Sequence, residues 1–249
     1  MKKQNDFEGR SGDTEDLACS SGRLFSELHN AEPILFKVGE LGSSYMQWVH
    51  RPAPGQPRFF RSPVIEYLTK TPWWLVPVIW VPIILVCLRK AFLAFNLQWP
   101  QCLLLVATGV LLWQLLEYCI HRHIFHAEPS SYWAITLHFG FHGCHHKFPQ
   151  DRERLVFPPL PAFFIAAAIH AVLATVLPQE AVMPVFAGVL LGYLVYDCVH
   201  YAIHHAQRGG QWLVGLKRAH LNHHFRDPTT NFGISSKLFD SLLQSCPKP

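Results

Sequence analysis

The sequence has few charged side chains. Only 15% of its 249 residues are Asp, Glu, Lys or Arg, whereas an average soluble domain carries roughly 25%. Half of the residues are hydrophobic, and the net charge of +4 is 21 basic minus 17 acidic side chains. This charge is too small and too scattered for a nucleic-acid-binding surface, but it suits loops that face anionic lipid. The composition therefore favours a membrane protein and argues against nucleic acid as a partner.

Cysteine pairs and a leading apolar segment are missing as well. The seven cysteines are odd in number, include no CxxC pair and partly lie in apolar runs, which indicates reduced thiols. The first long apolar run starts near Pro72, so we expect no signal peptide. We predict a disordered tail over residues 1–30, where polar residues dominate. We predict an interfacial arm over residues 31–71, where proline and glycine interrupt short apolar pieces.

Four apolar runs follow, and each is near the roughly 20 residues that cross a bilayer core of about 30 Å. They span residues 73–88, 102–120, 161–177 and 182–203. We predict an all-α, multi-pass membrane domain over residues 72–249, with about four transmembrane helices and a cytosolic helical cap. The alternative is a soluble bundle with very apolar core helices.

Basic residues indicate how these runs are oriented. The link after the second run and the segment after the fourth are rich in lysine and arginine, whereas residues 178–181 contain neither. Because positively charged loops stay on the cytosolic side, we expect both basic segments and the N-terminus in the cytosol. Arg89 and Lys90 conflict with this scheme, which leaves open that the first run re-enters the membrane instead of crossing it.

Histidine is unusually frequent, with 16 residues. Ten of them form four clusters at the cytosolic ends of the second and fourth runs or in the segments that follow. The clusters are His121 and His126; His142, His145 and His146; His200 and His204; and His220, His223 and His224. Neutral imidazole is a good ligand for iron, zinc or copper. Ten such ligands exceed what one ion takes, so we predict a site for two metal ions in the cap.

The spacing within the clusters has a geometric meaning, because residues three or four apart share one face of a helix. The H-x-x-H-H pattern occurs twice and is expected to present three imidazoles on one side of a helix. His200 and His204 also share a face. His121 and His126 are five apart, which places them about 140° apart on a regular helix. These two side chains can converge only if the helix ends or unwinds between them.

The other histidines are interpreted as structural, or as support for the clusters where they lie close. They are His29, His50, His123, His138, His170 and His205. Two acids stand near the clusters: Glu117 is one turn before His121, and Asp197 is three residues before His200. A carboxylate at membrane level is costly unless it is paired. Each acid is predicted either to accept the free ring N–H of a ligand histidine or to pair with Arg122 or a backbone group.

Further motifs flank the histidines. They include Trp48-Val49-His50, Glu117-Tyr118, His142-Gly143-Cys144-His145-His146-Lys147, Leu155-Val156-Phe157-Pro158-Pro159, His220-Leu221-Asn222-His223-His224-Phe225 and Phe232-Gly233-Ile234. With these motifs the sequence resembles the fatty acid hydroxylase superfamily of membrane di-metal enzymes, and specifically the fatty acid 2-hydroxylases. The similarity extends over about residues 34–245 and is greatest to the short plant-type members.

The resemblance implies a four-span enzyme of the endoplasmic reticulum membrane with its metal site on the cytosolic side. Such an enzyme inserts one oxygen atom from O₂ at carbon 2 of a long-chain fatty acyl group, mostly for sphingolipids and ceramides. The ten clustered histidines fall on the metal-ligand positions of the family. Many relatives carry a cytochrome b5 domain with a His-Pro-Gly-Gly haem motif, which is missing from this sequence. Electrons are therefore expected from a separate cytochrome b5 and its NAD(P)H-dependent reductase.

Hydroxylation of an unactivated C–H bond needs a redox-active metal, O₂ and two electrons, and no catalytic side chain is expected beyond the metal ligands. Zinc has no redox chemistry, so we expect iron in the working enzyme, although zinc can occupy such a site. Sterol or carotenoid hydroxylases and desaturases share the histidine pattern but not the motifs at residues 155–159 and 232–234. A zinc transporter is the non-enzymatic alternative, but transporters bind their ions near the bilayer midplane.

Overall fold

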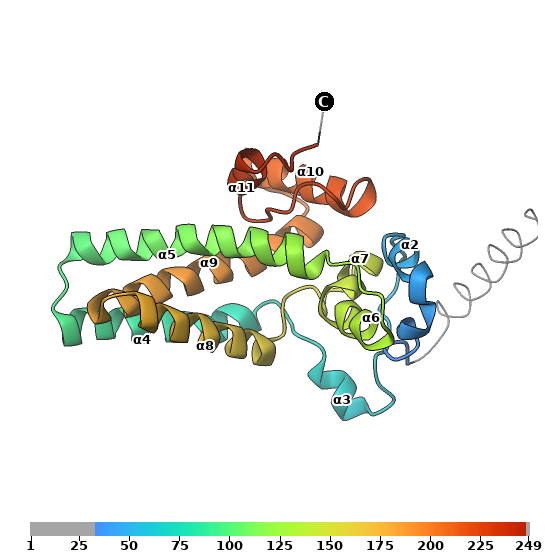
Figure 1. Ribbon diagram of the computed structural model, residues 1–249, viewed down its shortest axis with the longest axis horizontal. Helices are drawn as coiled ribbons and strands as arrows, with labels where there is room; N and C mark the ends of the chain where they lie inside the picture. Colours follow the sequence, from blue (N-terminus) through green and yellow to red (C-terminus); the bar gives the residue numbers. More distant parts are fainter. Residues whose placement is uncertain (1–32, 248–249) are drawn as a thin grey trace, which may run out of the picture.

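The computed structural model describes residues 33–247, which contain helices but no strand (Figure 1). In this range four long helices form a bundle, and shorter helices gather at one of its ends. The all-α prediction is therefore confirmed. The disordered tail predicted for residues 1–30 lies outside the described residues.

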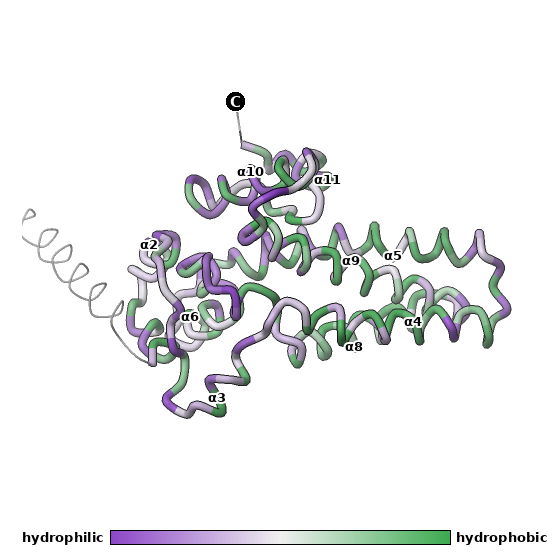
Figure 2. Tube along the Cα trace, turned by 180° about the vertical axis from the view of Figure 1, so that it is seen from behind, coloured by the Kyte–Doolittle hydropathy of each residue, from purple (hydrophilic) through white to green (hydrophobic). Residues whose placement is uncertain are grey.

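The four long helices match the four apolar runs, and each is long and apolar enough to cross a membrane. They are α4 (Leu75–Phe95), α5 (Trp99–Ile120), α8 (Pro159–Val176) and α9 (Gln179–His205). Figure 2 shows hydrophobic residues along their length, in contrast to the mixed colouring of the shorter helices. Side chains such as Leu103, Leu104 and Phe164 stay exposed on the outside of the bundle. Because exposing so large an apolar surface to water is energetically unfavourable, we expect this surface to face lipid tails.

Helix α9 is the centre of the bundle. Of its most apolar stretch 61% is buried, against 22% or less in each of the other three long helices. The ring of Tyr193 on α9 meets the edges of Trp80 and Trp113, with ring centroids 5.3 Å apart in both pairs. His200 and His204 lie near the C-terminal end of the same helix. The packing of the bundle therefore sets the position of these two histidines.

The bundle consists of two helical hairpins whose short turns lie at the end far from the shorter helices (Figure 1). Residues 96–98 connect α4 to α5, and residues 177–178 connect α8 to α9. Asn96 ends α4 with a left-handed conformation, φ 50°, which is common after helices. Helix α4 continues through Arg89 and Lys90, so the structure favours a full span over a re-entrant segment. Since these two residues lie in its last turns, their charged ends can reach the edge of the membrane.

Helices α5 and α9 touch backbone to backbone at a pair of glycines. A Cβ atom added to Gly109 would lie 2.0 Å from the carbonyl oxygen of Val185, and one added to Gly188 would lie 2.1 Å from that of Val106. Small residues permit such a close approach, which increases the van der Waals contact between membrane helices. The glycine pair therefore holds α9, which carries His200 and His204, against α5, which leads directly into His121.

We expect Gly188→Ala to lower the free energy of unfolding by about 1–3 kcal/mol, because the new methyl group overpacks the contact between α5 and α9. Its matched control is Gly215→Ala on α10 (Gln211–Phe225), where an added Cβ meets no atom within 4 Å. The midpoint of thermal unfolding in detergent should fall for G188A and stay the same or rise for G215A. Equal midpoints for the two variants would contradict the close contact.

The segment before the bundle and the short helices after α5 form a second hydrophobic core, the cap. It contains η1 (Val38–Ser44), α2 (Tyr45–Val49), α6 (Tyr132–His138), η3 (Phe139–Gly143) and α7 (Cys144–Lys147). Trp48 and Phe139 pack in this core with ring centroids 5.6 Å apart. The ammonium of Lys147 donates to the carbonyl oxygens of Trp48 and Arg51 at 3.2 and 2.6 Å. Much of the predicted arm is thus part of the cap, whereas α3 (Pro63–Leu68) has no buried residue.

The C-terminal segment covers the same end of the bundle from another side (Figure 1). Helix α10 packs against α9, and α11 (Leu238–Leu242) packs against α5. Between them, residues 226–237 form a loop that returns toward the end of α5. The cap, α10 and this loop therefore surround the point where α5 and α9 end.

Candidate metal centre

The ten clustered histidines meet between the end of the bundle, the cap and α10. His121 begins η2 (His121–Phe125), which continues α5, and His126 directly follows it. The second cluster lies on η3 and α7, the third at the end of α9, and the fourth on α10. Nine of the ten side chains are buried, and His126 is half-buried. The structure thus brings together all the histidines that the clusters singled out.

Within the described residues these side chains form two groups, in each of which the candidate ligand atoms lie within 4.8 Å of one another. The five-histidine group consists of His145, His200, His204, His220 and His224. The four-histidine group consists of His121, His126, His142 and His146. The Nε2 atom of His223 lies 2.9 Å from that of His126, so His223 adjoins the four-histidine group. Each group can hold a metal ion.

Each H-x-x-H-H cluster contributes to both groups. His142 and His146 belong to the four-histidine group, whereas His145 between them belongs to the five-histidine group. The last cluster divides in the same way, because its first and third histidines belong to one group and His223 adjoins the other. The three imidazoles of each H-x-x-H-H cluster are all buried, but they do not all point to the same group. Residues i and i+4 lie about 40° apart around a helix, but residues i+3 and i+4 lie about 100° apart.

A π-helical turn brings His121 and His126 together. The N–H of His126 donates to the carbonyl oxygen of His121 at 3.1 Å, a hydrogen bond between residues five apart. This wider turn places the two ring centroids 4.9 Å apart, so the expected break in the regular helix is present. A second π-helical segment, η3, leads into the second cluster. Such segments are frequent at functional sites.

The imidazoles are held in the neutral form. Burial, followed by the neighbouring histidines, lowers the pKa of His145, His220 and His224 well below the usual value of 6.5. Burial also lowers the pKa of His126 and His142. Because the neutral ring offers a lone pair, this is the form that binds metals.

Hydrogen bonds between the rings cannot account for the close contacts in the five-histidine group, as the surroundings of His220 show. Its Nε2 lies 3.0 Å from the Nε2 atoms of His200, His204 and His224. A neutral Nε2 has either one proton or one lone pair, so it cannot form good hydrogen bonds to three such neighbours. A metal ion, in contrast, accepts a lone pair from every ring. Two nitrogens that are each about 2.1 Å from an ion, with an angle of about 90° between the two bonds, lie about 3.0 Å from each other. The donor set therefore fits a bound ion.

Backbone carbonyls orient two of the rings. The Nδ1–H of His121 donates to the carbonyl oxygen of Phe232 at 2.5 Å, and that of His223 donates to Thr230 at 2.7 Å. A bond of this kind fixes the ring and leaves Nε2 free for a metal. Both carbonyls belong to the loop between α10 and α11, so this loop sets the direction of two candidate ligands.

Glu117 supports the same loop. Its Oε1 accepts the backbone N–H groups of Ile234 and Ser235 at 2.7 and 2.8 Å, and the Ser235 hydroxyl donates to Oε2 at 2.5 Å. The loop in turn presents the Phe232 carbonyl to His121. Glu117 thus acts on a histidine ring through the backbone that it holds.

Asp197 also binds backbone. Its Oδ1 accepts the N–H of Phe157 at 3.3 Å, in the link before α8. Two roles were predicted for Glu117 and Asp197, and their bonds in the described residues match the pairing with backbone groups. Neither carboxylate accepts a hydrogen bond from a clustered histidine in that part of the chain.

The family model for fatty acid hydroxylases matches residues 106–245, which contain all ten clustered histidines. The chain belongs to the fatty acid hydroxylase family. It is 42% identical to dihydroceramide fatty acyl 2-hydroxylase FAH2 of Arabidopsis thaliana, over 87% of this chain and 92% of the relative. It is 41% identical to human fatty acid 2-hydroxylase, over 84% of this chain and 62% of the relative.

A solved structure agrees with this membership. The hydroxylase domain of full-length scs7p superposes with a TM-score of 0.81 at 32% identity, covering 88% of this chain and 84% of that one. The protein is thus an enzyme, an oxidoreductase with the fold of this family. The predicted family, fold class and kind of enzyme are therefore confirmed.

His50 of this hydroxylase lies beside the metal centre, although its position in the sequence indicated only the arm. Its ring stacks on that of His126, with centroids 5.9 Å apart and an angle of 9° between the planes. It also meets His146 edge to face at 5.3 Å. The sequence marked His50 only through the Trp48-Val49-His50 motif. Its contact with the clustered histidines depends on the folding of the cap over them.

His138 also lies beside the centre, outside the two groups. One ring nitrogen lies 2.7 Å from the carbonyl oxygen of Phe125, and the other lies 2.7 Å from the hydroxyl of Tyr45. Burial lowers the pKa of His138 to about 4, so the ring is neutral and bridges the arm to η2. The ring of Phe125 in turn stacks on His142 with centroids 4.7 Å apart. His138 therefore links α2 to η2 beside the four-histidine group, and its supporting role stays a prediction.

Two cavities of the hydroxylase approach the histidines. The bundle cavity lies among α5, α8 and α9 and is lined mainly by apolar side chains, such as Trp113, Ile165 and Leu190. The cap cavity, of about 400 Å³, is bounded by α6 and the loops around α3 and α8, and it includes three clustered histidines: His142, His145 and His200. Phe125, Phe157 and Tyr196 line both cavities. The two cavities are therefore adjacent, although the bundle cavity measures only about 50 Å³.

Proposed function

We propose that this hydroxylase inserts one oxygen atom from O₂ at carbon 2 of long-chain fatty acyl groups destined for sphingolipids. The observation that carries the proposal is the pair of neutral histidine groups, three members of which line a largely apolar cavity at the end of the bundle of membrane helices. Relatives over most of the chain are named for this reaction, among them the dihydroceramide hydroxylase of Arabidopsis thaliana and the human fatty acid 2-hydroxylase. A fatty acyl or ceramide substrate in a membrane fits these relatives.

We assign the metal ligands group by group. The five-histidine group is to hold one ion, and the four-histidine group together with His223 is to hold the other. Iron bound in both would supply the redox chemistry that activates O₂, a role that zinc cannot take even where it occupies the site. The chain contributes neutral imidazoles, the carbonyl of Phe232 that aims His121, and apolar walls that keep water from the reacting carbon.

The acyl chain is to follow the line of the bundle cavity with its head toward the cap, and this cavity must widen from its present volume of about 50 Å³ to admit the chain. Apolar walls of this kind select chain length only weakly, by about 1–3 kcal/mol for each methylene group. Phe125, Phe157 and Tyr196, which line both cavities, would surround the chain where it passes the metals. Carbon 2 is two bonds from the head-group heteroatom, so a head in the cap cavity keeps that carbon near His142, His145 and His200.

We place the enzyme in the endoplasmic reticulum membrane with the cap in the cytosol. Basic residues on the cap side and the lack of lysine and arginine in the turn between α8 and α9 support this orientation. We also propose that α3 lies at the surface of the membrane, on the cytosolic side. Two electrons per turnover are to come from cytochrome b5 and its NAD(P)H-dependent reductase, which a cytosolic cap leaves accessible.

Expression with cytochrome b5 in a host that lacks 2-hydroxy fatty acids tests the reaction. We expect mass spectrometry of the sphingolipids to find acyl chains heavier by one oxygen atom, with the label of ¹⁸O₂ at carbon 2. A desaturase would give chains that have lost two hydrogen atoms, and a sterol or carotenoid hydroxylase would leave the acyl chains unchanged. Zinc flux without any lipid oxidation would favour a transporter instead.

A further inference from the structure

The cap cavity has one formally charged group among the described residues that line it, Arg154. This residue lies in the link between α7 and α8, and it lines the cavity together with the clustered histidines His142, His145 and His200. Most of the remaining lining is aromatic or aliphatic. The side chain of Arg154 is only 5% exposed. A buried charge in such surroundings is costly unless it is paired.

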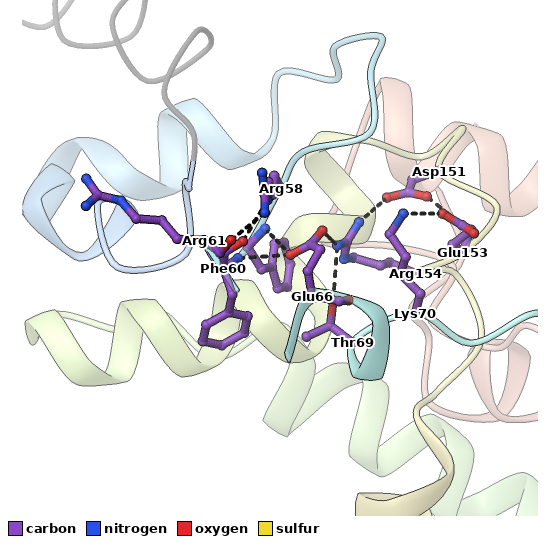
Figure 3. Close-up of polar contacts among 10 residues, drawn as sticks. Arg58, Phe60, Arg61, Glu66, Thr69, Lys70, Asp151, Glu153 and Arg154 are labelled. Carbon is purple, nitrogen blue, oxygen red and sulfur yellow. Dashed lines mark hydrogen bonds and ion pairs between the residues drawn. The ribbon is translucent and has the colours of Figure 1, made fainter. Parts of the chain in front are cut away.

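Two carboxylates pair with this guanidinium, as Figure 3 shows. Nη2 of Arg154 contacts Oε1 of Glu66, and Nη1 lies 3.1 Å from Oδ2 of Asp151. Nη2 also donates to the hydroxyl of Thr69 at 3.1 Å, and the guanidinium lies 4.4 Å from the ring centroid of Phe59. We call Arg154, Glu66 and Asp151 the arginine cluster. The two carboxylates already compensate the positive charge of Arg154.

One donor of the arginine cluster is left over. Nε of Arg154 is buried and has no hydrogen-bond partner within residues 33–247. The carboxylate of Glu66 is fully used, because its Oε2 accepts the N–H groups of Phe59 and Phe60 at 2.8 and 2.9 Å. An unpaired buried donor is unfavourable. A ligand that brings an acceptor to Nε would therefore gain a hydrogen bond without competition from the protein.

We propose that Arg154 positions the polar head of the acyl lipid in the cap cavity and favours an uncharged head over an anionic one. This inference rests on the proposed function. The Nε–H donates to a neutral acceptor, such as an amide carbonyl or a hydroxyl oxygen. Because Glu66 and Asp151 already pair with Nη2 and Nη1 of Arg154, the guanidinium offers no uncompensated charge to a free carboxylate or to the phosphates of coenzyme A. Because the same cavity reaches His142, His145 and His200, a head held here sets which carbon lies at the metals.

The first test compares Arg154→Lys and Arg154→Gln with the wild-type enzyme in lipid nanodiscs. Each is given an N-acyl lipid with an uncharged head and the free fatty acid of the same chain length. Lysine keeps the positive charge between the two carboxylates but lacks the Nε–H, so R154K separates positioning from folding. We expect kcat/KM for the N-acyl lipid to fall about ten- to hundredfold in both variants, the effect of losing a hydrogen bond to a charged donor. We also expect hydroxyl groups to appear at carbons other than carbon 2.

The second test removes a negative charge and keeps Arg154. Asp151→Asn leaves a neutral side chain of the same shape beside the guanidinium. We expect the ratio of kcat/KM for the free acid to kcat/KM for the N-acyl lipid to rise severalfold. The matched control is Lys70→Gln, which breaks the half-buried ion pair between Lys70 and Glu153, 2.6 Å in length, in the same part of the molecule (Figure 3). It should leave both the ratio and the position of the hydroxyl group unchanged.

The outcomes separate this inference from the proposed function. If R154K and R154Q retain the wild-type hydroxyl position and substrate ratio, Arg154 merely ties α3 to the link before α8, and the inference is overturned. An unchanged ratio in D151N would overturn the preference for an uncharged head. If the wild-type enzyme gives no 2-hydroxy product from either lipid, the proposed function fails instead, and the role of Arg154 falls with it.

Discussion

Replacing His145 with alanine is expected to remove one of two bound metal ions and to lower hydroxylation by more than about a hundredfold. Loss of a group that merely orients a ligand already costs about 10- to 100-fold in metal affinity or activity. His145 contributes a donor atom itself: its Nε2 lies 2.9 Å from that of His200. No other histidine of the second cluster belongs to the five-histidine group, so none can replace it without moving α7.

The measurement is metal content by mass spectrometry together with the yield of 2-hydroxy fatty acid. His126→Ala should have the same effect through the four-histidine group. The matched control is His123→Ala, which changes an exposed histidine within two residues of His121 and should leave metal and product near the wild-type level. Full product from either H145A or H126A would remove the basis for the assignment of that group.

Removal of the metals with a chelator is expected to lower the free energy of unfolding by about 3 kcal/mol or more, the stabilisation that a ligand gives at a hundred times its Kd. The physical reason lies in the donor atoms. Within the five-histidine group the Nε2 atoms crowd together, since that of His220 lies 3.0 Å from those of His200, His204 and His224. Without ions, nothing compensates for the lost hydration of these rings.

Refilling separates the stabilising role of a metal from its chemical role. Iron(II) is expected to restore both the unfolding midpoint and the 2-hydroxylase activity. Zinc is expected to restore the midpoint alone, since it has no redox chemistry. Thermal unfolding and product yield, measured on the same samples, give both quantities. Activity with zinc alone would argue against a redox role for the ions, and an unchanged midpoint after complete metal removal would argue against metal binding at the buried rings.

Spacing along the chain was sufficient to find the ten histidines and the helices that carry them. Apolar runs of near 20 residues predicted the four long helices, because the thickness of a bilayer sets that length. The five-residue separation of His121 and His126 even predicted a break in the regular helix, which the π-helical turn provides. The placement of α3 at the membrane surface and the assignment of individual ligands stay predictions.

Other features of the site depend on segments far apart in the chain. His50 lies about 70 residues or more before the histidines it contacts, and only the hydrophobic core of the cap brings it to His126 and His146. Glu117 acts through a loop more than a hundred residues later. Arg154 has no sequence signal of its own: Asp151 lies three residues before it, but Glu66 pairs with it only after α3 folds back on the link.

The sequence by itself determined the fold class and the ten imidazoles, since hydrophobic length and helical spacing are local properties of a chain, and its flanking motifs indicated the kind of enzyme by resemblance. Tertiary structure decided how each H-x-x-H-H cluster divides between two groups of histidines, which backbone carbonyls orient the rings, and where an arginine faces the cavity. These features arise where helices cross. A crossing depends on side-chain packing between distant segments, such as the contact between Gly109 and Gly188, which no local pattern specifies.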